Sequence, residues 1–134
     1  MREHLTSIFW YVAGFALSVV LFALLLAWGG VYPFGAESFL TEDLKYQYID
    51  FFTWYRSVLF GGQSLLYTFS ISLGSDTWAL FSYYLSSPFN LLVVFFDEQH
   101  LTEFALLVTV LKVGCIQMST MWFLRRRFGL RHGW

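Results

Sequence analysis

The sequence predicts an all-α integral membrane protein with two transmembrane helices that flank a large, partly helical extracytoplasmic loop. Three observations lead to this fold class. The 134 residues are 57% hydrophobic and only 13% charged, whereas a soluble domain carries about 25% charged residues. Two stretches are long and apolar enough to cross a bilayer, and arginines lie outside both of them. The net charge of −1 gives no basic surface, so nucleic acid is not expected as a partner.

The first predicted transmembrane helix covers residues 8–28. No charged residue occurs between Leu5 and Ala36. At about 1.5 Å per residue, the helix crosses a hydrocarbon core of about 30 Å. Residues 1–7 then form a short cytoplasmic N-terminus. A cleaved signal peptide is the alternative, but it needs a shorter apolar region and small residues at the cleavage site, which Leu-Ala-Trp-Gly does not supply.

The second predicted transmembrane helix covers residues 104–124, and residues 125–134 form a basic cytoplasmic tail. Between the two helices, residues 29–103 contain eight acidic residues and only two basic ones. Basic residues mark the cytoplasmic ends of membrane spans. Both termini are therefore expected in the cytoplasm of a multi-pass cell-membrane protein. The loop is expected outside the cell, with amphipathic helices at the membrane interface.

Two further uncharged stretches, residues 57–75 and 77–96, lie inside the loop. If one of them crossed the bilayer alone, the basic ends would fall on opposite faces, so only two or four spans agree with the charges. Glycines weaken the first stretch as a span, and Pro88 would break a helix in the second. We expect two spans, with both stretches on the membrane surface or docked against other protein.

The main candidate site begins a predicted helix at the N-cap Thr41. Helical spacing gathers four polar residues on one side: Asp43, Tyr46, Gln47 and Asp50. The apolar side consists of Leu44, Tyr48, Phe51, Phe52, Tyr55 and Leu59. One hypothesis makes Asp43 a general base that takes a proton from an acceptor hydroxyl, with Asp50 or Glu42 orienting the substrate or a metal. The simpler hypothesis, which spacing alone favours, makes Glu42 and Asp43 acids that stabilise the helix start.

A series of short motifs runs along most of the chain. They are Gly30-Val-Tyr-Pro-Phe-Gly35, Asp43-Leu44, Gln47-Tyr48, Gly61-Gly62-Gln-Ser64, Tyr83-Tyr84, Ser87-Pro88-Phe-Asn90 and Leu111-Lys112. In this order they resemble the beginning of the bacterial YfhO family. That family is similar to GT-C type glycosyltransferases, membrane enzymes that move a sugar from a polyprenyl-phosphate carrier to a cell-envelope acceptor. The resemblance implies that Asp43 matches the catalytic base of the first external loop. Gln47 and Asp50, on the same side of the helix, are the candidates for substrate binding in the loop.

The resemblance also implies a longer protein, because family members carry many more spans. The chain is therefore expected to be an N-terminal piece of such a transferase, inactive alone. Its expected partners are the lipid bilayer, the polyprenyl-phosphate sugar and the remaining spans of the protein. The cofactor is left open: a divalent metal is compatible with the acids of the loop, but the sequence requires none.

Lys112 is a charge inside the second predicted span, eight residues from its start. A charge at this depth costs about 3 kcal/mol on insertion scales and faces protein or water. Its partner is either the phosphate of a lipid carrier or an acid from another helix. His100 beside Asp97 and Glu98 is a weaker metal candidate, better explained as an exposed turn. Two other functions stay open: a small non-enzymatic assembly protein, or part of a lipid or solute transporter.

Overall fold

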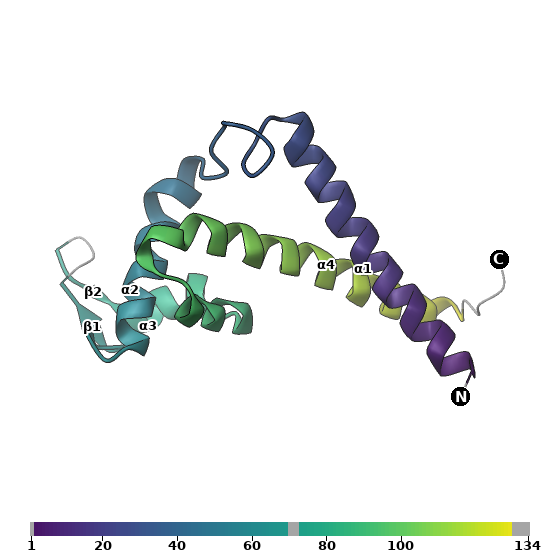
Figure 1. Ribbon diagram of the computed structural model, residues 1–134. Coiled ribbons are helices and arrows are strands. Elements are labelled where there is room, and N and C mark those ends of the chain that lie inside the picture. The colour runs from purple at the N-terminus through teal and green to yellow at the C-terminus, as the bar shows by residue number, and fades with distance from the viewer. Residues whose placement is uncertain (1, 70–72, 130–134) are drawn as a thin grey trace. The chain divides into compact units, whose positions relative to one another are not determined.

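The computed structural model describes residues 2–69 and 73–129, and within them the chain is mostly helical (Figure 1). Two helical segments of this described part are long and apolar enough to cross a membrane, Ser7–Trp28 and Glu98–Phe128. The predicted all-α membrane fold with two spanning helices is confirmed. The chain divides into two compact units, Met1–Glu37 with Thr109–Trp134, and Ser38–Val108.

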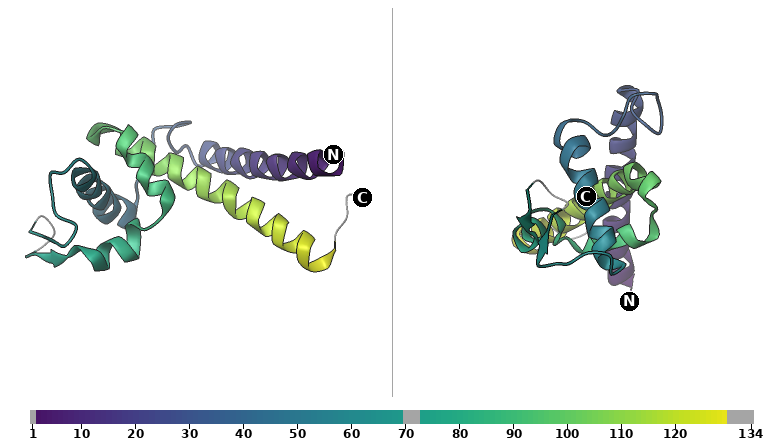
Figure 2. Two further views of the ribbon diagram at one scale, coloured as in Figure 1. Left: turned by 90° about the horizontal axis from the view of Figure 1, so that it is seen from below. Right: turned by 90° about the vertical axis from the view of Figure 1, so that its left-hand side faces the viewer.

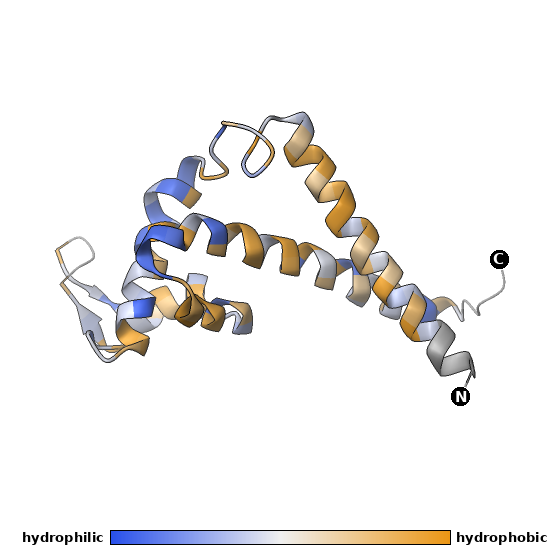
Figure 3. Cartoon of the chain, viewed as in Figure 1, coloured by the Kyte–Doolittle hydropathy of each residue, from blue (hydrophilic) through white to orange (hydrophobic). Residues whose placement is uncertain are grey.

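Helix α1 spans Arg2–Trp28 and contains the first predicted transmembrane segment, residues 8–28. Apolar colour runs along most of the helix in Figure 3. The helix ends where predicted because Gly30 takes a positive φ of 65°, and the Val31 amide donates to the Leu26 carbonyl at 2.9 Å. A left-handed glycine at this position lets the chain reach back to the last carbonyls of the helix.

Helix α4 spans Leu101–Phe128 and contains the second predicted transmembrane segment, residues 104–124. The helix extends beyond the predicted C-terminal boundary through three consecutive arginines. Arginine is a good helix former, and positive charge is favourable near a helix C-terminus, so the helix continues after its apolar stretch has ended. It stops before Gly129, which has a φ of 60°.

The second unit begins with a π-helical turn, η1 (Leu44–Tyr48), that leads directly into helix α2 (Ile49–Leu59). Two short antiparallel strands follow, β1 (Tyr67–Thr68) and β2 (Ser75–Asp76). Residues 70–72 of their connection lie outside the described chain. The regular structure of the described part of this unit is therefore helical except for this two-stranded hairpin, which is also visible in both views of Figure 2.

Two short helical segments after the hairpin form a bent pair. Helix α3 (Thr77–Leu80) continues into η2 (Phe81–Leu85), and η3 (Pro88–Phe95) follows. The halves Thr77–Leu85 and Pro88–Phe95 meet at 98°, and together they pass as a broken span or a re-entrant loop by length and composition. Ser87 is extended, with a ψ of 132°, because a residue before proline avoids the helical region. The predicted helix break at Pro88 is confirmed.

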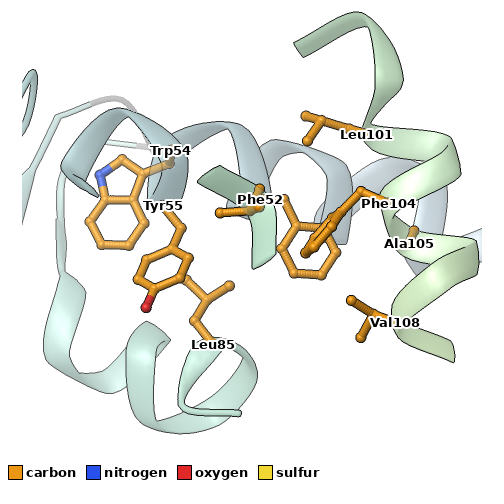
Figure 4. Packing of buried hydrophobic residues seen from close by; sticks show 9 residues of the cluster. Phe52, Trp54, Tyr55, Leu85, Leu101, Phe104, Ala105 and Val108 are labelled. Carbon is orange, nitrogen blue, oxygen red and sulfur yellow. The ribbon is translucent and has the colours of Figure 1, made fainter. Parts of the chain in front are cut away.

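An aromatic core holds the second unit together (Figure 4). Its buried apolar residues are Phe52, Trp54, Tyr55, Leu85, Val93, Leu101, Phe104, Ala105 and Val108. The rings of Phe52 and Phe104 meet edge to face with centroids 4.9 Å apart. Phe52 and Tyr55 are buried as the apolar pattern predicts, whereas Leu59 is 39% exposed. Trp54 lies outside the predicted apolar side and is nevertheless buried.

Arg56 fastens α2 to the segment that leads into α4. Its Nε donates to the Phe96 carbonyl at 2.7 Å, and its guanidinium lies 3.6 Å from the Asp97 carboxylate. The same guanidinium stacks on the Phe60 ring, 4.8 Å from its centroid. A short turn, η4 (Glu98–His100), then connects this segment to α4. One side chain thus fixes the start of α4 against α2.

Candidate functional site

The chain turns sharply just before Asp43. Glu42 has a φ of 46°, in the left-handed region that few side chains adopt, and the Leu44 amide donates to the Thr41 carbonyl at 3.0 Å. The helical segment begins after Thr41, as predicted. Asp43 makes no capping hydrogen bond at the start of η1, and its side chain is exposed. The helix dipole still favours a carboxylate at this position.

A hydrogen-bonded chain of side chains links Asp43 to the bent pair. Gln47 Nε2 donates to Asp43 Oδ1 at 3.2 Å, and the Tyr84 hydroxyl donates to Gln47 Oε1 at 3.4 Å. We name Asp43, Gln47 and Tyr84 the Asp–Gln–Tyr chain. Asp43 immediately precedes the π-helical turn η1 and Gln47 lies within it, and such turns are frequent at functional sites. The two residues predicted on one helix face are therefore joined by a third residue from another element.

Tyr84 determines which way the Gln47 amide points. A hydrogen bond with Tyr83, and secondly burial, raise the pKa of Tyr84 to about 12, so its hydroxyl stays protonated. Because this hydroxyl donates to the Gln47 oxygen, the amide nitrogen of Gln47 faces Asp43. An amide donor paired with a charged carboxylate makes a stronger bond than a neutral pair. One oxygen of the Asp43 carboxylate is held in place in this way.

Aromatic rings hold Tyr84 in position. The Tyr48 ring meets it edge-on with centroids 4.6 Å apart, and the Phe51 ring lies at 5.2 Å. The neighbouring Tyr83 ring lies at 4.0 Å. Burial, with smaller effects of Tyr83 and Asp43, raises the pKa of Tyr48. The Tyr84 hydroxyl is therefore placed by rings from η1, α2 and its own helical turn.

Asn90 fixes the main chain behind Tyr84. Its side chain is fully buried, and its Nδ2 donates to the Tyr84 carbonyl at 3.0 Å, which joins η3 to the end of η2. Its Oδ1 is buried without a hydrogen-bond partner. Asn90 is a positioning residue, because it acts through Tyr84. Neither residue is among the predicted site residues, although both lie in the motifs Tyr83-Tyr84 and Ser87-Pro88-Phe-Asn90.

Comparison with known proteins identifies the family of the chain. A family model described as "Bacterial membrane protein YfhO" matches residues 13–134. The chain belongs to the YfhO family. No curated protein and no solved structure matches it. The resemblance noted from the motifs is confirmed at the level of the family, and the matched range includes every residue of the Asp–Gln–Tyr chain.

The other predicted site residues of this YfhO-family protein are not part of the Asp–Gln–Tyr chain. Asp50 is exposed on α2. Lys112 is half-buried on α4 and belongs to the first unit, whereas the Asp–Gln–Tyr chain belongs to the second. Within residues 2–69 and 73–129, no three His, Cys, Asp or Glu side chains gather as a metal site, and this includes His100 with its acidic neighbours.

Proposed function

We propose that this YfhO-family protein contributes the external loop of a membrane glycosyltransferase. In this proposal a sugar moves from a polyprenyl-phosphate carrier to a hydroxyl of a cell-envelope acceptor. The observation that supports it is the Asp–Gln–Tyr chain, in which an exposed carboxylate is held on one oxygen by Gln47 at 3.2 Å. A general base needs this combination of fixed orientation and access to the acceptor.

The proposed reaction assigns each group one role. The acceptor hydroxyl gives its proton to the Asp43 carboxylate while its oxygen forms a bond to the anomeric carbon of the sugar. The bond between that carbon and the phosphate oxygen breaks, and the polyprenyl phosphate leaves with the electron pair. Gln47 and Asp50 orient the substrate, and Lys112 meets the phosphate of the lipid carrier. The role of Asp43 follows the family resemblance, that of Lys112 follows from its charge within the second span, and those of Gln47 and Asp50 follow from their place beside Asp43 on the helix.

The experiment compares Asp43→Asn with Glu42→Gln. Sugar transfer is measured in membranes that contain the chain together with the remaining spans of a full-length family member, with a labelled polyprenyl-phosphate sugar as donor. Asp43→Asn keeps the shape of the side chain but removes the base, so transfer should fall about 10²- to 10⁴-fold. Glu42→Gln removes one neighbouring acid and should retain most of the activity. Expression and membrane insertion should not change in either variant.

Similar activity in Asp43→Asn and Glu42→Gln would contradict the proposal and leave Asp43 as a helix-start residue. Tyr84→Phe provides a second measurement, because it removes only the hydroxyl that orients Gln47. A decrease smaller than that of Asp43→Asn is expected.

A function in membrane assembly is the second candidate, and Lys112 favours it. This lysine is half-buried within a helix segment that is apolar enough to span a membrane. A charge in such a segment usually pairs with protein or water. In this alternative Lys112 joins other helices and Asp43 has no catalytic role. If the protein were part of a transporter, Lys112 would lie on the transport path. Replacing it would then abolish transport and leave sugar transfer unaffected.

We also propose that both termini lie in the cytoplasm and that the loop between α1 and α4 is external. The acidic bias of the loop and the arginines at the end of α4 support this topology. In a Cys115→Ala background, cysteines at Ser38 and His100 should react with an impermeant thiol reagent in intact cells. A cysteine at Gly133, which lies outside the described residues, should not react. Labelling at Gly133 with protection at Ser38 would reverse the proposed topology.

A further inference from the structure

We propose that the first unit binds one anionic phospholipid between α1 and the C-terminal part of α4. An acyl chain of the lipid occupies a cavity between these segments, and Arg126 holds the phosphate of the headgroup. This site is independent of the proposed sugar transfer, because it uses none of the residues assigned to that reaction.

The cavity has a volume of about 560 Å³ and is lined by Tyr11, Met118, Ser119, Trp122 and Phe123. This volume lies within the range of about 300–1,000 Å³ that is typical of small-molecule sites. The lining is mainly apolar with two hydroxyl groups. Trp122 and Phe123 remain 53% and 56% exposed. The protein therefore provides an apolar wall at this position but does not cover it.

Two long side chains lie between α1 and the C-terminal part of α4, next to the cavity. Met121 Sδ lies against Gly14, so close that a Cβ added there would be 2.5 Å from it, and the Phe15 ring lies against Gly114 in the same way. Each bulky side chain thus fits over a glycine of the opposite helix. These contacts fix the distance between the two segments. The space beside them, lined by the cavity residues, is not filled by side chains of the protein.

The charges next to the cavity indicate the chemistry of this occupant. Arg126 lies seven residues after Ser119, which is two helical turns, so both residues share one face of α4. Its guanidinium lies over the Trp122 ring, 5.5 Å from the centroid. Arg125 lies over the Tyr11 ring at 5.2 Å. Two guanidinium groups are therefore placed on rings that also line the cavity, and the guanidinium fork suits a phosphate.

A phospholipid fits this arrangement better than free phosphate. The lining residue Ser119 lies about 10 Å along the helix from Arg126, on the side that leads into the apolar stretch of α4. A ligand that fills the cavity and reaches Arg126 must therefore have a long apolar part and an anionic end. Basic pockets between membrane helices bind anionic headgroups in this way.

The experiment measures lipid binding to the purified protein in a neutral detergent by native mass spectrometry. The probes are dioleoylphosphatidylglycerol, dioleoylphosphatidylcholine and inorganic phosphate. One phosphatidylglycerol should bind per protein, more tightly than phosphatidylcholine. Arg126→Gln should weaken phosphatidylglycerol binding about fivefold, the contribution of one arginine near an anionic headgroup. Arg127→Gln removes the same charge about 100° further around the helix and should change binding less than about twofold.

A second variant tests the cavity without changing any charge. Ser119→Phe fills part of the space, and the loss of a few buried methylene groups should weaken both lipids about tenfold. Equal losses in Arg126→Gln and Arg127→Gln would overturn the proposal in favour of diffuse attraction. If millimolar inorganic phosphate displaced phosphatidylglycerol, the site would bind a free anion rather than a phospholipid, and the proposal would be wrong. A disulfide-linked dimer of Ser119→Cys, in a Cys115→Ala background, would show that a second copy fills the cavity.

Discussion

The two units of the molecule use the same apolar residue types in opposite ways. In the candidate span Ser7–Trp28, none of the most apolar window is buried inside the protein, and Phe9 is 63% exposed. In the second unit, Phe104 is completely buried in an aromatic core. Burying an apolar side chain against another helix gains little in lipid, whereas in water it gains about 25 cal/mol per Å². The comparison indicates that the second unit is held together by contacts among its own apolar side chains, whereas α1 leaves such side chains exposed.

The largest effect is expected when Phe104 is replaced by alanine. The substitution removes a ring from the centre of the core and leaves a cavity, which typically costs about 3–5 kcal/mol. Hydrogen exchange of the backbone amides in α2 should become faster by a corresponding amount. The matched control is Phe9→Ala, which removes the same side chain from the exposed surface of α1 and should leave these amides unchanged.

Equal effects of Phe104→Ala and Phe9→Ala would show that the two units fold as one cooperative structure. The contrast between a lipid-facing and a core-forming unit would then be wrong. A substitution of Phe104 by leucine keeps most of the volume and should restore most of the protection, which separates loss of packing from loss of folding.

A smaller effect is expected for Lys112→Leu, which tests how the membrane-spanning part of the first unit responds to the loss of a charge. Here a charge is the costly group, so its removal should favour insertion of α4 by about 3 kcal/mol. The measurement is the inserted fraction of this segment in a microsomal insertion assay. Thr120→Leu is the control, because the Thr120 hydroxyl already bonds to the Ile116 carbonyl at 2.8 Å within the helix. If both variants gain equally, Lys112 already reaches water at the membrane surface.

The smallest effect is expected for Asn90→Ala. This variant removes the donor to the Tyr84 carbonyl and leaves that carbonyl without its bond, which costs about 1–3 kcal/mol. Limited proteolysis near the bend of the bent pair should become faster. Ser86→Ala is the control, since Ser86 is exposed and the hydrogen bond from its hydroxyl to the Ser82 carbonyl is long at 3.4 Å. Unchanged proteolysis in Asn90→Ala would mean that Pro88 alone maintains the bend.

The parts of the fold that depend on residues adjacent in the sequence could be predicted from the sequence. The two spans follow from continuous apolar stretches, and the break before Pro88 follows from local backbone sterics. The pair of Asp43 and Gln47 also follows from helical spacing. Tyr84 could not be placed, because its contact with Gln47 joins residues that are 37 positions apart.

Trp54 shows a different limit of the sequence pattern. It lies two residues after Phe52, and the two side chains therefore point about 160° apart around α2, yet both are buried. An amphipathic pattern assumes that one side of a helix is covered and that the other faces solvent. Helix α2 is enclosed on two sides, and only the tertiary contacts of the second unit reveal this.

The π-helical turn η1 has a consequence for changes in gene length. Such a turn accommodates one more residue than an α-helical turn, so loss of one codon within residues 44–48 would convert it to an ordinary turn without breaking the helix. Both kinds of turn complete one revolution, so Asp43 would keep its direction relative to the core residues of α2. A single-codon deletion at this place would leave the carboxylate and the aromatic core in register, whereas the same deletion within the regular helix α2 would rotate the residues before it by about 100°.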